Sequence, residues 1–164
     1  MQNCKIKFLL FLIFLPFLSL SQNSKYNPSY CIEITGYISE NVDSLSADSL
    51  LIFFKQFSIK TNENNVEFSE WGNEILFKVM KNRPELFFNT LFHMSKEEQK
   101  SIEDEINSPI NDGINMIKFH KELENCKLDQ KTKQRALIFI DKSYKAFKKM
   151  IEEWEKKYNK KWEY

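Results

Sequence analysis

The sequence predicts an all-α fold, a single domain built as a bundle of about six helices with a long C-terminal helix. Three observations predict it. The chain has only three glycines and four prolines in 164 residues, too few for the many tight turns of a β-rich domain. Apolar residues recur three and four residues apart along most of the chain beyond residue 46. The last such series, from Leu137 to Tyr158, is long and unbroken.

Beyond the apolar run at 8–20, the stretch from residue 68 to 94 is the richest in large apolar side chains. A three-and-four spacing places the first set on one side of a helix: Phe68, Trp71, Ile75, Leu76 and Val79. Pro84 ends that helix and suits the first turn of the next, where its missing N–H is not needed. The spacing then resumes at Leu86, Phe87, Leu91 and Met94. We expect a helical hairpin whose apolar faces are covered by the rest of the chain.

Residues 1–21 have the layout of a secretory signal peptide and are not expected to join the fold. Lys5 and Lys7 precede an apolar run from 8 to 20, shorter than the roughly 20 residues of a spanning helix. The small residues Ser19 and Ser21 favour cleavage after Ser21, which leaves one helical domain at 22–164. We therefore predict export to the periplasm or the exterior of a bacterial cell; a retained membrane anchor is the alternative.

Between the leader and the hairpin the pattern is less regular. Residues 30–38 fit either an extended segment or a helix, and a helix or irregular segment is favoured because a single strand would have no partner. Ser46 is placed to cap a helix over 47–57, with Leu50 and Phe54 facing inward. The polar residues 58–65 are predicted to form a loop.

After the hairpin, Ser95 and Glu98 form a capping box that starts a mostly polar helix over 96–107. Ser108 and Pro109 are predicted to start another helix. The motifs Asn-Arg-Pro-Glu and Asn-Ser-Pro-Ile each separate two predicted helices, about 25 residues apart. This weak internal repeat leaves a HEAT-like stack of helical pairs as an alternative to an irregular bundle.

Asp129 is placed to cap the final helix, which runs to Tyr158 and would be about 45 Å long at 1.5 Å per residue. A domain of this size is under about 40 Å across, so we expect the helix end to overhang the body. Residues 159–164 are predicted to fray. The overhanging seam is the predicted partner-binding surface: Met150, Ile151, Trp154 and Tyr158. Self-association through the same stripe is the structural alternative.

Charge is balanced overall but uneven along the chain. Residues 127–164 contain 12 basic and 6 acidic residues, and residues 22–126 contain 10 and 17. The balance argues against a nucleic-acid partner. The basic tail helix either lies against the acidic body, is simply a solvated face, or offers a surface to an acidic partner or an anionic membrane. Contact with a membrane surface is disfavoured because Glu152, Glu153 and Glu155 interrupt the basic face.

An exported chain meets an oxidising compartment, which predicts a disulfide between Cys31 and Cys126. Two buried thiols are the alternative. The pair His120 and Glu124 has metal-ligand spacing but no further ligand at a suggestive distance in sequence, so no metal or cofactor is predicted.

The motifs of common catalytic sites are not found in the sequence: it has neither a phosphate-binding glycine loop nor a nucleophile turn. The nearest to a carboxylate pair is Glu70 and Glu74, which flank Trp71; a small envelope hydrolase using them is the alternative function. The favoured hypothesis is a non-enzymatic protein that binds another protein, by class analogy an inhibitor or immunity-type partner.

Overall fold

The computed structural model describes residues 29–108 and 114–162, and within them the chain is helical, without a β-strand. The α-helices in chain order are α2 (Tyr30–Glu40), α3 (Ala47–Gln56), α4 (Val66–Asn82), α5 (Pro84–Phe92), α6 (Lys96–Asn107), α7 (Met116–Asn125) and α8 (Gln130–Tyr158). Two short 3-10 helices, η1 (Val42–Ser44) and η2 (Lys60–Asn62), lie in the connections. The predicted all-α class with a long C-terminal helix is confirmed. The predicted signal peptide lies outside the described residues.

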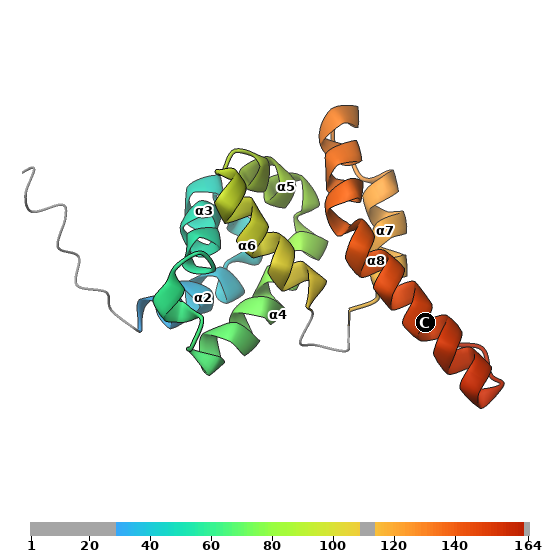
Figure 1. Ribbon diagram of the computed structural model, residues 1–164. Coiled ribbons are helices and arrows are strands. Elements are labelled where there is room, and N and C mark those ends of the chain that lie inside the picture. Colours follow the sequence, from blue (N-terminus) through green and yellow to red (C-terminus); the bar gives the residue numbers. More distant parts are fainter. Residues whose placement is uncertain (1–28, 109–113, 163–164) are drawn as a thin grey trace, which may run out of the picture.

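The helices form two parts, which we call the body and the arm (Figure 1). In the body, α2 packs on α3 and α4, α5 packs on α3 and α4, and α6 closes the group against α3 and α4. The arm is an antiparallel hairpin of α7 and α8, joined to the body where α8 packs on α6 and α5. Because α7 packs mainly along α8, the described helices form an irregular bundle rather than two stacked pairs.

Side-chain caps set the helix starts. Ser46 accepts a hydrogen bond from the N–H of Ser49 at the start of α3, and Asp129 accepts from the N–H of Thr132 at the start of α8. Ser95 and Glu98 form the predicted reciprocal capping box of α6. These three predicted starts are confirmed.

The start of α7 differs from the prediction. The helix begins at Met116, and its cap is Asn115, whose side chain accepts from the N–H of Lys118 at 2.8 Å. The predicted start at Pro109 lies outside the described residues. The ambiguous stretch at 30–38 is resolved as the helix α2, and the predicted loop at 58–65 contains η2, where buried Asn62 donates to the carbonyl of Gln56.

The core sits where the predicted hairpin, α4 and α5, meets α3. Four phenylalanines there are fully buried: Phe53, Phe54, Phe87 and Phe88. Phe87 lies edge-on to Phe54 and to Phe88, with ring centroids 4.9 and 5.2 Å apart. Such edge-to-face pairs add to the free energy of burying the rings. The hairpin is therefore the centre of the body, as the apolar spacing predicted.

Candidate partner-binding surface

The first half of α8 is fixed to the body. Ala136 and Ile140 are fully buried, and the hydroxyl of Ser143 donates to the carbonyl of Ile106 at 2.7 Å and lies 2.8 Å from Oδ1 of Asn107. These polar contacts join α8 to the last turn of α6. They set the direction in which the second half of α8 leaves the body.

The second half projects beyond α7 and the body (Figure 1). We call residues 150–162, the end of α8 and the turn after it, the tip. In the predicted seam, Met150 and Tyr158 are 46% and 51% exposed, and Trp154 is partly buried. Ile151 is only 4% exposed. Three of the four predicted residues thus reach the surface, while Ile151 is buried.

Three aromatic rings pack together at the tip and form a cluster. The ring of Trp154 lies 5.1 Å from Tyr158 and 5.0 Å from Trp162, the latter in an edge-on arrangement. Asn159 adopts a left-handed conformation (φ 50°), which turns the chain back so that the N–H of Trp162 donates to the carboxylate of Glu155 at 2.8 Å. The prediction that this segment frays is therefore wrong for residues 159–162. The residues in the sequence that could have indicated this ordered turn are Asn159, a residue type that tolerates the left-handed conformation, and the aromatic Trp162.

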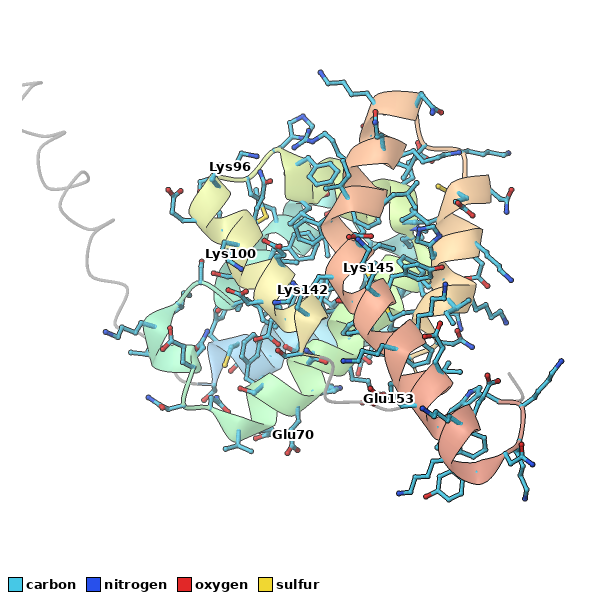
Figure 2. The ribbon with its side chains drawn as sticks, turned by 45° about the vertical axis from the view of Figure 1, so that its right-hand side comes forward. Glu70, Lys96, Lys100, Lys142, Lys145 and Glu153 are labelled. Atoms are coloured by element: carbon cyan, nitrogen blue, oxygen red, sulfur yellow. The ribbon has the colours of Figure 1, made fainter. Side chains whose placement is uncertain are left out.

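The charge of α8 is not neutralised by the body. Every ion pair among the described residues lies within one helix; on α8 these are Lys145 with Asp141 and Lys149 with Glu153. The first half of α8 does lie against the body, on α6 and α5, but the described residues form no ion pair there. The contact consists of apolar side chains, Ser143 and the guanidinium of Arg135 over the ring of Phe92. Figure 2 shows the side chains of the tip extending outward with no other helix beside them.

The predicted disulfide is not formed in the described residues. Cys31 is buried beside the start of α4, and its Sγ accepts a hydrogen bond from Nδ2 of Asn65 at 3.4 Å. Cys126 lines a groove with Asn82 and Arg83, at the other end of α4. The ends of α4 are about 25 Å apart at 1.5 Å per residue, whereas a disulfide needs Cα atoms within about 7 Å. Burial also raises the pKa of the Cys31 thiol, which favours the protonated form.

The carboxylates are arranged differently from the predicted pair. Glu70 and Glu74 are both exposed; Glu74 lines a groove of about 530 Å³ between α4 and α7, and Glu70 points away from the body (Figure 2). Sequence reasoning missed Glu105, whose pKa is raised by burial although Nδ2 of Asn73 donates to it at 2.9 Å. Its position three residues after Ile102, on the buried side of α6, was the available signal.

The histidines have local partners. His120 stacks on Tyr144 with ring centroids 4.3 Å apart, and its Nδ1 lies 3.7 Å from the carboxylate of Glu124. Nδ1 of His93 contacts the carbonyl of Asn89 on its own helix. Within the described ranges, no group of three or more His, Cys, Asp or Glu side chains is placed to hold a metal ion.

A groove of about 800 Å³ lies between the start of α3 and α5 and also includes Cys126. Leu51 and Leu86 supply apolar surface there, and Arg83 is already bound to the backbone carbonyl of Val42. Thr90 also lines the groove, and its hydroxyl oxygen is buried with no hydrogen-bond partner among the described residues. This groove therefore presents mixed polar and apolar edges without a converging set of reactive groups.

Comparison with models of known protein families, with curated proteins and with solved structures finds no match to this chain. Among the helices that the structure describes, none has both the length and the apolar character needed to cross a membrane. The tip of α8 is thus identified as a candidate site by its own geometry.

Proposed function

We propose that this protein is exported and acts by binding another protein through the tip of α8, without catalysing a reaction. The observation that carries the proposal is the aromatic cluster of Trp154, Tyr158 and Trp162 on a helix end that projects from the body. Trp and Tyr are enriched among the few residues that supply most of the binding free energy at protein interfaces, where the partner covers them.

The cluster is also held in place before any partner arrives. The turn at Asn159, the hydrogen bond from Trp162 to Glu155 and the packing of the rings on one another fix the cluster relative to α8. A surface that is already ordered loses less conformational entropy on binding than a flexible one. This supports recognition by the tip rather than by a loose tail.

Export rests on the pattern of residues 1–21, with its basic start, apolar run and small residues before the cleavage position. An exported helical protein that binds a partner fits the class of inhibitors and immunity-type proteins, which act by covering a surface of another protein. We place its action in the periplasm or outside a bacterial cell.

Site-specific photocrosslinking tests the proposal. Replacing Tyr158 by p-benzoylphenylalanine in the native cells should give a crosslink to one other protein, because this side chain is 51% exposed on the tip. The same replacement at Val66, 69% exposed at the start of α4, is the matched control. A product that forms equally at Val66, or none at Tyr158, would overturn the proposed role of the tip.

Self-association through the same stripe needs a separate measurement. Light scattering after size exclusion should give the same monomer mass for the wild-type chain and for Trp154→Glu. A wild-type dimer that the substitution converts to a monomer would instead identify the tip as a self-association surface.

A further inference from the structure

The tip and the helix leading to it carry an excess of positive charge. Residues 142–162 include 8 lysines and 3 glutamates, a net charge of about +5. Four lysines lie beside the aromatic cluster, and none of them has a described carboxylate within ion-pair distance: Lys156, Lys157, Lys160 and Lys161. Lys157 instead lies 5.2 Å from the ring of Tyr158.

Two of the three acids that interrupt this basic surface are occupied within α8 and its turn. The carboxylate of Glu153 pairs with Lys149 at 3.7 Å, and that of Glu155 accepts the N–H of Trp162. Lys149 offsets the charge of Glu153, and counting every charged side chain of residues 142–162 still leaves a net charge of about +5. The exposed lysines therefore dominate the field around the rings.

We propose that the partner of the tip is a protein with an acidic surface, on which Asp or Glu side chains surround an apolar patch that receives Trp154 and Tyr158. This inference rests on the proposed function and specifies the chemistry of the partner. Lysines around an aromatic anchor speed association with an acidic surface and suppress binding to basic ones.

The same charges disfavour a second tip as the occupant. Contact between the tips of two copies would bring eight lysines together around the rings, namely Lys156, Lys157, Lys160 and Lys161 from each copy. Like charges across an interface oppose association. A lipid surface is also disfavoured, because Ile151 is only 4% exposed and the ring of Trp154 packs on Tyr158 and Trp162, which leaves a smaller apolar area than an amphipathic helix inserts into a bilayer.

The test uses two labelled amphipathic helical peptides of equal length, one with Glu and one with Lys at every charged position, and vesicles of phosphatidylglycerol. Fluorescence anisotropy with the chain from Gln22 onward should show binding of the Glu peptide that weakens steeply as salt is raised. The Lys peptide and the vesicles should not bind. No binding of the Glu peptide at low salt, or equal binding of both peptides, would overturn the inference. Vesicle binding would identify a membrane instead.

A charge-removing variant links the binding to the tip. Changing Lys156, Lys157, Lys160 and Lys161 to Gln should weaken binding of the Glu peptide at least about tenfold at low salt. The matched control changes four exposed lysines elsewhere to Gln: Lys55, Lys81, Lys96 and Lys121. It removes the same total charge and should leave the affinity within about twofold. Circular dichroism of both variants shows that the helices are retained, and equal losses of affinity would contradict a role for the tip.

Failure of this inference is distinguishable from failure of the proposed function. If the crosslink at Tyr158 persists in the four-lysine variant and at high salt, the tip binds a protein but not through its charge. If no crosslink forms at Tyr158 in the wild-type background, the proposed function itself is wrong.

Discussion

The body and the arm contain similar kinds of side chain but expose them differently. In the body, Phe54 and Phe87 are fully buried between α3 and α5, whereas in the arm Tyr158 is 51% exposed and Trp154 is covered mainly by its own neighbours along the chain. The difference arises because the helices of the body are enclosed by others on several sides, while α8 continues past the last helix beside it. The buried aromatic rings therefore stabilise the body, whereas those at the end of the arm form an ordered and partly exposed surface.

The largest effect is expected in the body. Phe87→Ala should lower the free energy of unfolding by about 3–5 kcal/mol, because it removes a fully buried ring and leaves a cavity beside Phe54 and Phe88. Urea denaturation followed by circular dichroism measures the loss. Trp154→Ala is the comparison from the arm and should cost less than about 1.5 kcal/mol. Similar losses for the two substitutions would remove the distinction between body and arm.

The next effect tests the join between the two parts. Ser143→Ala should lower the free energy of unfolding by about 1–3 kcal/mol, since the carbonyl of Ile106 loses its buried donor and the contact with Asn107 is lost. Ser101→Ala on α6 is the control, because that hydroxyl contacts only the carbonyl of Glu97 on its own helix. Hydrogen exchange should show faster opening of the arm in the Ser143 variant, and an unchanged arm would contradict the join we describe.

A smaller effect with a definite pH dependence is expected at Glu105. Burial raises its pKa in the folded state above the usual 4.5, so the folded protein holds this proton more tightly than the unfolded chain. The stabilisation from the protonated carboxyl is present below pH 4.5 and is lost as pH rises through the folded-state pKa. Glu105→Gln, which keeps an acceptor for Asn73, should therefore raise the melting temperature at pH 7, and the gain should vanish near pH 4.

Thermal unfolding at several pH values measures this gain, and the exposed Glu70→Gln is the control for removing one negative charge. A gain that is the same at pH 4 and pH 7 would mean that Glu105 acts by packing alone. The result also concerns the contrast between the body and the arm, because Glu105 lies on α6, the helix to which the arm is attached.

The smallest effect on stability is expected at the tip itself. Trp162→Ala removes the edge-on contact with Trp154 and should cost less than about 1 kcal/mol, because the body does not depend on it. It should nevertheless make Trp154 more accessible to iodide, measured by fluorescence quenching with Trp71 as the remaining internal reference. Unchanged quenching would mean that Trp162 does not cover Trp154 in solution.

Much of the fold could be predicted because it depends on neighbours in sequence. The caps Ser46, Ser95 and Asp129 each bond a backbone N–H two or three residues away, so the residue pattern alone located the starts of α3, α6 and α8. The apolar spacing around Pro84 likewise located the hairpin. The overhang followed from the length of α8 compared with the size of a domain.

The candidate site was predicted only in part. The spacing of Met150, Ile151, Trp154 and Tyr158 identified one face of α8, but spacing does not tell which member is covered. The turn at Asn159 and the return of Trp162 also escaped the helical pattern, because a helix period carries no information beyond the end of the helix.

The sequence by itself determined the helical class, most helix boundaries and the uneven charge, because these depend on residue types and on interactions within one or two turns. Only the tertiary structure decided that Cys31 and Cys126 stand near opposite ends of α4, that Asn73 meets Glu105, and that α8 leaves its lysines unpaired by the body. Each of these depends on how helices distant in sequence pack, and packing is set by the combined shape of many side chains.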